Sequence, residues 1–143
     1  MSVLWFDGLL ANVDDAGVYF LPDADVDELL EAAAVNRFPL LRINLRGCVD
    51  KADLLLRIAG VLEMPPHVVR NWDALADALG GLRTPGAPGQ VLLLEHSEQV
   101  RTTARDEFKT AMEVLQAASV NWAAGEVPLW TFIVTSEAEF DAL

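Results

Sequence analysis

The residues of this chain whose type and spacing most clearly suggest a chemical role are two aspartates, Asp73 and Asp77, which lie four residues apart. On an α-helix this spacing places both carboxylates on one side, one turn from each other. Asn71 is a natural N-cap for such a helix, and the helix dipole favours Asp73 in the first turn. Neither a metal-ligand spacing nor a nucleophile accompanies the two acids. The pattern therefore favours a helix edge that presents negative charge to a partner.

The segment that carries these acids has the periodicity of a short amphipathic helix. Trp72, Leu75 and Leu79 recur at helical spacing and define one apolar side. Gly80 and Gly81 then end the helix, because glycine is the usual residue just beyond a helical C-terminus. The sequence thus predicts a helix over residues 71–80 with an apolar side and an acidic edge.

The run Asn-Trp-Asp-Ala-Leu-Ala-Asp-Ala-Leu at residues 71–79, which follows a Leu-x-x-Pro element, resembles the barstar family of intracellular ribonuclease inhibitors. The resemblance extends more loosely over residues 38–136. It implies a small α/β protein, not an enzyme, that plugs a ribonuclease active site with this helix and the loop before it. It also implies that Asp77 takes the place of a substrate phosphate, that Asp73 supports it, and that Asn71 belongs to the same binding surface.

The segments flanking this helix depart from the family pattern at several positions that the resemblance places near the partner: His67, Val69, Arg70 and Leu82. Val69 replaces a glycine, which permits backbone conformations that valine resists. Arg70 replaces an acid, and at this spacing it could pair with Asp73. Leu82 replaces a tryptophan and offers less contact surface. These departures argue against tight inhibition of barnase itself and are compatible with a different, related partner.

Strand patterns alternate with helical patterns along the chain, which predicts an α/β fold with parallel pairing through crossovers. Helices are predicted at residues 23–34, from about 50 to 62, at 71–80 and at 105–123. A short helix or turn is expected at 98–103, and a short terminal helix or a frayed end at 137–143. The resemblance implies a three-stranded parallel sheet built from Phe38–Leu45, Gln90–Glu95 and Leu129–Thr135. From its pattern alone, Gly17–Pro22 predicts a fourth strand at an edge of this sheet.

The formal net charge of −12 is distributed unevenly. Residues 1–36 contain eight acids and no Lys or Arg, whereas residues 37–136 carry a net charge of only −1. The length of 143 residues predicts a single domain, in which 1–36 is an acidic N-terminal extension and 38–136 the barstar-like core. An acidic protein repels nucleic acid and attracts basic partners. Solubility alone is the plainer explanation of the charge, and composition by itself favours it.

Other features of the sequence indicate the cellular compartment and bear on the need for cofactors. Apolar runs stay well short of the ~18 residues of a membrane span, and the N-terminal segment lacks the basic region of a secretory signal. Cys48 is the only cysteine, which excludes an intramolecular disulfide and fits a reducing cytoplasm. We therefore expect a cytoplasmic monomer without metal or cofactor and without a nucleic-acid or membrane partner.

Three interpretations of function remain open from the sequence. The favoured one is an inhibitor, or immunity protein (antitoxin), that masks a small basic cytotoxic ribonuclease or related toxin made by the same bacterial cell. The second is a non-inhibitory binding module that uses acidic residues 1–36 against another basic protein. The third is an enzyme with an unrecognised site, which is disfavoured because the chain lacks a catalytic constellation.

Overall fold

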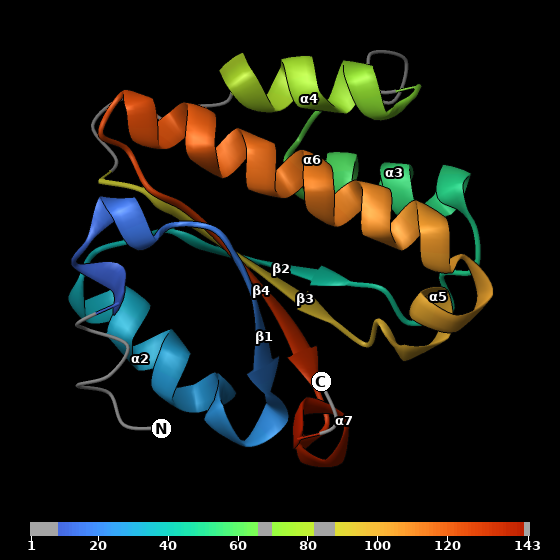
Figure 1. The fold of residues 1–143 in the computed structure, drawn as a ribbon, viewed down its shortest axis with the longest axis horizontal. Coiled ribbons are helices and arrows are strands. Elements are labelled where there is room, and N and C mark those ends of the chain that lie inside the picture. The colour runs from blue at the N-terminus through green and yellow to red at the C-terminus, as the bar shows by residue number, and fades with distance from the viewer. Residues whose placement is uncertain (1–8, 66–69, 82–87, 142–143) are drawn as a thin grey trace.

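A four-stranded, all-parallel sheet forms the centre of the computed structural model, which describes residues 9–65, 70–81 and 88–141 (Figure 1). The strands run in the order β1-β4-β3-β2 across the sheet. They are β1 (Val18–Pro22), β2 (Leu40–Asn44), β3 (Gln90–Glu95) and β4 (Leu129–Thr135). The α/β fold with a small parallel sheet that the sequence predicts is thus confirmed.

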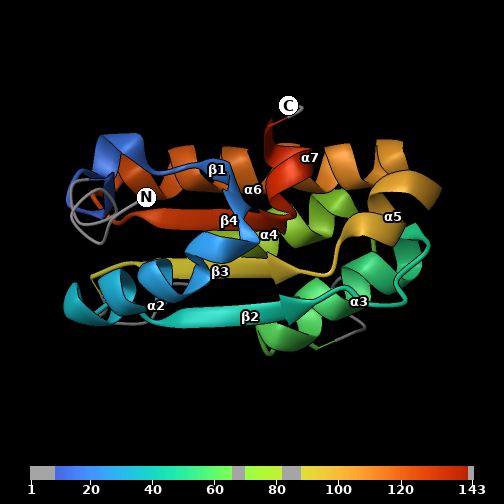
Figure 2. The same ribbon diagram turned by 90° about the horizontal axis from the view of Figure 1, so that it is seen from below.

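Helices cover both faces of this sheet, with α2 on one face and α3, α4 and α6 on the other (Figures 1 and 2). The α-helices are α2 (Val26–Val35), α3 (Lys51–Val61), α4 (Trp72–Gly81), α5 (Glu98–Thr103), α6 (Arg105–Ala124) and α7 (Glu137–Asp141), and the 3₁₀ turns are η1 (Val13–Asp15) and η2 (Asp23–Asp25). The helices predicted from periodicity are therefore present, including the two short ones.

The sequence of the central strand β3 is almost wholly apolar because both faces of the strand are covered. Leu92 and Leu94 pack with the helices of the α6 side, whereas Val91 and Leu93 pack on the α2 side. Successive side chains of a strand point to opposite faces, so a strand covered on both faces needs apolar residues at every position. The same argument applies to β4, whose Trp130 and Phe132 face α2 while Ile133 faces α6.

The N-terminal strand β1 is built into the sheet. It lies parallel to β4 at the edge, with Val18 opposite Thr131, and the Thr131 N–H donates to the Gly17 carbonyl at 2.9 Å. Leu21 is 1 % exposed and packs with Leu29 of α2 on the same side of the sheet. The prediction of a fourth edge strand is confirmed, and the acidic N-terminal segment contributes part of the core.

Acidic residues of this segment occupy positions that suit helix starts. Asp23 and Asp25 lie in η2, and Asp27 and Glu28 lie in the first turn of α2. Negative charge at these positions is favoured by the helix dipole, typically by a few tenths of a kcal/mol up to ~1 kcal/mol each. Part of the acidity therefore has a local structural explanation.

None of the helices in the described residues combines the length and the apolar character that crossing a bilayer requires.

An ion pair joins strands β2 and β3, and it predicts an effect of pH on stability. Arg42 donates to both carboxylate oxygens of Glu95, at 2.7 and 2.8 Å, and these hydrogen bonds lower the pKa of Glu95 against the opposing effect of burial. Because the folded-state pKa is depressed, the stabilisation is present above the unfolded value of about 4.3 and disappears as the pH falls through the folded value.

Glu95→Gln is therefore expected to lower the free energy of unfolding at pH 7 by about 0.5 kcal/mol, a small effect because the Arg42 side chain is 52 % exposed and solvent screens the pair. Urea unfolding at pH 7 and pH 3 measures the difference from the unsubstituted protein. The difference should shrink toward pH 3, and one that stays constant with pH would contradict the assignment.

Candidate protein-binding site

The start of α4 is fixed by the residue that the sequence predicts as its N-cap. The side-chain oxygen of Asn71 accepts a hydrogen bond from the Ala74 N–H at 2.8 Å, which satisfies one of the free donors in the first turn. Asp73 follows in that first turn, where the helix dipole favours its charge. The N-cap prediction is confirmed, and α4 has a defined beginning next to its acidic residues.

Asn71→Ala is expected to destabilise α4, since it removes the acceptor for the Ala74 N–H. Loss of a side-chain N-cap typically lowers the free energy of unfolding by ~1 kcal/mol. Chemical denaturation followed by circular dichroism measures this, with Asn71→Asp as the control that keeps an acceptor at the same position. Equal destabilisation by both variants would show that capping is not the cause.

The inner side of α4 is anchored on α6, which lies directly beneath it in Figure 1. Leu75 and Leu79 are fully buried in the core between the two helices. At the start of α4, the indole N–H of Trp72 donates to the Glu107 carboxylate at 2.9 Å. Near its end, the indole N–H of Trp122 donates to the Leu79 carbonyl at 2.9 Å within the protein interior. α6 therefore holds α4 close to both of its ends.

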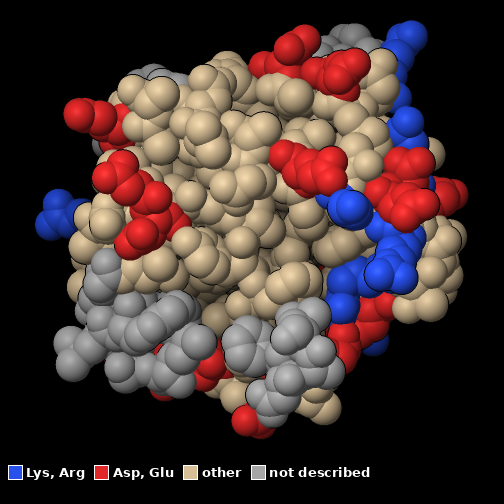
Figure 3. All heavy atoms as spheres, in the orientation of Figure 1, with Lys and Arg blue, Asp and Glu red and all other residues tan. Residues whose placement is uncertain are grey.

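The outer side of α4 carries the acidic edge. Asp73 and Asp77 are both exposed, as are Asn71 and the preceding Arg70. Figure 3 shows acidic side chains on the surface over α4, at the top of the view. Within the described part of the chain, neither aspartate carboxylate has an ion-pair or hydrogen-bond partner. Both carboxylates are thus available to a partner molecule.

Four of the residues predicted from the sequence, Arg70, Asn71, Asp73 and Asp77, therefore lie on one short exposed stretch at and before α4. The predicted residues His67, Val69 and Leu82 lie outside the described residues. Across the ranges that the structure describes, no group of three or more His, Cys, Asp or Glu side chains could hold a metal ion. The chemistry available on α4 is recognition by carboxylate and amide groups.

Two groups that support the site were not identified from the sequence. Glu107 carries no local pattern that would pair it with Trp72, 35 residues earlier. Trp122 is a core residue of α6, 3 % exposed, and its hydrogen bond to Leu79 depends on how α4 and α6 pack. A buried tryptophan usually finds a hydrogen-bond partner, which was the one available signal.

Comparison with known proteins identifies the family of this chain. Residues 38–134 match the sequence model of the family described as Barstar (barnase inhibitor). The match runs from before β2 to the last residue but one of β4 and includes all of α4, whereas β1 and α2 precede it. The curated protein sequences contain no significant match to this chain. Since the matched region is well over half of the 143 residues, the chain belongs to the barstar family.

Proposed function

We propose that this chain inhibits a small basic ribonuclease of the barnase type by covering its active site with α4 and the segments that flank it. The observation that carries the proposal is the presentation of Asp73 and Asp77, which are exposed on a helix anchored near both ends by α6. A ribonuclease must gather cationic side chains to hold a substrate phosphate. A carboxylate fixed in space can occupy that position through charge-assisted hydrogen bonds.

In this proposal Asp77 enters the phosphate position and Asp73 lies one turn nearer the start of α4. Because α4 is already anchored, binding costs less conformational entropy than it would for a mobile helix. Asn71 and Arg70 adjoin the two acids, and the proposal extends to His67, Val69 and Leu82 by their positions in the sequence next to α4.

The biological setting follows from this role. An inhibitor whose acidic helix must stay free is expected to act as a monomer, in the cytoplasm of the cell that makes the ribonuclease, as an immunity protein or antitoxin does. Calorimetric titration with a catalytically inactive barnase-type ribonuclease, at low and at physiological salt, tests the proposal. Tight one-to-one binding that weakens as salt increases supports it. Absence of binding at both salt concentrations contradicts it for this class of partner.

A second candidate function, binding of another basic protein by the acidic N-terminal segment, has one specific support. Asp23, Asp27 and Glu31 are exposed in a part of the chain that precedes the family match. Deleting residues 1–36 is a poor test, because it removes edge strand β1 and helix α2 from the core. Neutralising Asp27 and Glu31 by Asn and Gln leaves the core intact. If this variant, which retains Asp77, no longer bound the partner protein, the result would favour the second function.

A further inference from the structure

A second possible binding site lies on the side of α6 that faces β1. The pocket there has a volume of about 650 Å³ and lies between β1, α5 and the first two turns of α6. In Figure 1, β1 and α4 lie on different sides of α6, so this pocket is separate from the acidic edge of α4. Its volume is within the range of roughly 300–1,000 Å³ that is typical of small-molecule sites.

Apolar side chains from two elements line part of this pocket. Phe20 comes from β1, and Phe108 and Met112 come from α6. Phe20 is unusual because it is 38 % exposed, whereas Phe108 is largely covered at 6 %. An exposed phenylalanine ring beside a hollow offers a face against which a flat ring can stack.

Cationic side chains line the remainder of the pocket. Arg101, Arg105 and Lys109 line it with three positive charges, of which Asp106 in the lining and Glu139, paired with Arg101, offset two. Figure 3 shows Lys and Arg side chains on the right of the view, with Asp and Glu side chains among them, where α5 and the start of α6 lie in Figure 1. Within the described residues, neither Arg105 nor Lys109 has an ion-pair partner. A local excess of positive charge is notable in a chain with a net charge of −12.

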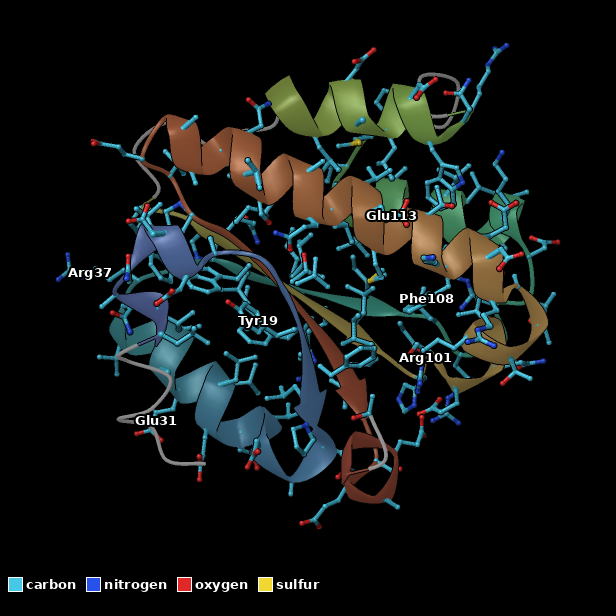
Figure 4. The ribbon with its side chains drawn as sticks, in the orientation of Figure 1. Tyr19, Glu31, Arg37, Arg101, Phe108 and Glu113 are labelled. Carbon is cyan, nitrogen blue, oxygen red and sulfur yellow. The ribbon has the colours of Figure 1, made fainter. Side chains whose placement is uncertain are left out.

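Arg101 is held in place by two neighbours. Its Nε donates to the Ser97 hydroxyl at 2.9 Å, and its Nη2 donates to the Glu139 carboxylate at 2.7 Å. Ser97 is fully buried, and the Glu139 N–H in turn donates to the Ser136 hydroxyl. These bonds use two of the five N–H donors of the guanidinium, so others are left for a ligand. Figure 4 shows Arg101 and Phe108 on the same side of α6.

We propose that this pocket binds a small phosphate-bearing molecule with a flat ring, of the mononucleotide class. The phosphate would lie among Arg101, Arg105 and Lys109, and the ring would stack on Phe20. A phosphate group matches the three cations better than a single carboxylate does, because it carries −1.5 to −2 charges and three acceptor oxygens. The proposal goes beyond ribonuclease inhibition and uses none of the α4 residues.

The distribution of charge favours a small ligand over a nucleic-acid chain. The pocket is positive only locally, and the rest of the molecule is strongly acidic. At physiological salt, charges act over a Debye length of about 8 Å. A single phosphate within the pocket would meet three cations with a net excess of one positive charge, whereas a long polyanion would also meet the acidic surface around them.

Calorimetric titration of the full chain with ADP, inorganic phosphate and adenosine at ~0.15 M salt tests the proposal. We expect ADP to bind at least about tenfold more tightly than either fragment, since only ADP engages both the cations and Phe20. Inorganic phosphate binding as tightly as ADP would overturn the stacking of a ring on Phe20. No binding of ADP would overturn the proposal.

Substitutions separate this pocket from general charge effects. The double variant Arg105→Gln, Lys109→Gln is expected to weaken ADP binding at least about tenfold. Arg37→Gln, at an exposed arginine far from the pocket in Figure 4, should leave it unchanged. Phe20→Ala should weaken ADP binding while leaving that of inorganic phosphate unaltered. Unchanged ADP affinity in the double variant would overturn the site assignment. Asp77→Asn, on α4, should leave ADP affinity unchanged.

Discussion

Replacing Asp77 with alanine is expected to weaken binding to a catalytically inactive barnase-type ribonuclease by roughly a hundredfold or more. The reason is that the cations of the ribonuclease would remain buried at the interface without the carboxylate that balances them. Removing one partner of a buried ion pair typically costs about 3–5 kcal/mol, and each 1.36 kcal/mol corresponds to a factor of ten. Isothermal titration calorimetry or the dissociation rate measured by surface plasmon resonance gives this number.

Matched variants make this expectation specific. Asp77→Asn keeps the shape of the side chain and removes its charge, so it should lose most of the same affinity. Glu31→Gln removes one charge from an exposed position of α2, on the opposite side of the molecule in Figure 4. This variant should leave affinity unchanged apart from a small effect on the association rate. If Glu31→Gln weakened binding and Asp77→Asn did not, the acidic N-terminal segment would be the binding surface instead.

Removal of the Trp122 side chain is expected to be the most damaging change to the support of α4. Trp122→Ala leaves a cavity between α4 and α6 and deprives the buried Leu79 carbonyl of its donor. Loss of a buried tryptophan side chain typically lowers the free energy of unfolding by about 3–5 kcal/mol. Urea denaturation followed by circular dichroism measures this quantity.

Trp122→Phe separates the hydrogen bond from the packing. It keeps most of the apolar volume and removes the N–H, so the expected loss is about 1–3 kcal/mol, the cost of an unsatisfied buried carbonyl. Val120→Ala, at an exposed position of the same helix, is the control and should change stability by less than about 0.5 kcal/mol. A Trp122→Ala variant as stable as this control would show that the contact to α4 contributes little.

The same variants connect stability to function. If α6 holds α4 in its binding geometry, Trp122→Phe should reduce affinity for the ribonuclease under conditions in which the variant remains folded. The charged surface is unchanged in this variant, so the reduction reflects the position and mobility of α4. Affinity equal to that of the unsubstituted protein would show that α4 keeps its geometry without the Trp122 hydrogen bond.

Local features of the sequence determined most of the elements. The apolar runs at β3 and β4 and the helical spacing of Leu75 and Leu79 depend on periodicity alone, because strand and helix place side chains with periods of 2 and 3.6 residues. Asn71 as N-cap and the exposed pair Asp73 and Asp77 follow from the same short-range rules. The residues predicted outside the described ranges, His67, Val69 and Leu82, stay predictions.

The tertiary structure alone decided which distant groups meet. Trp72 reaches Glu107 across 35 residues, and Trp122 reaches Leu79 across 43, because α4 packs on α6. The pocket likewise exists only because parallel pairing of β1 with β4 brings Phe20 next to α6. Periodicity and capping report the preferences of a few neighbouring residues. Contacts over such separations depend instead on how whole elements pack, so the sequence determined the acidic helix edge, and only the folded chain determined what holds it in place.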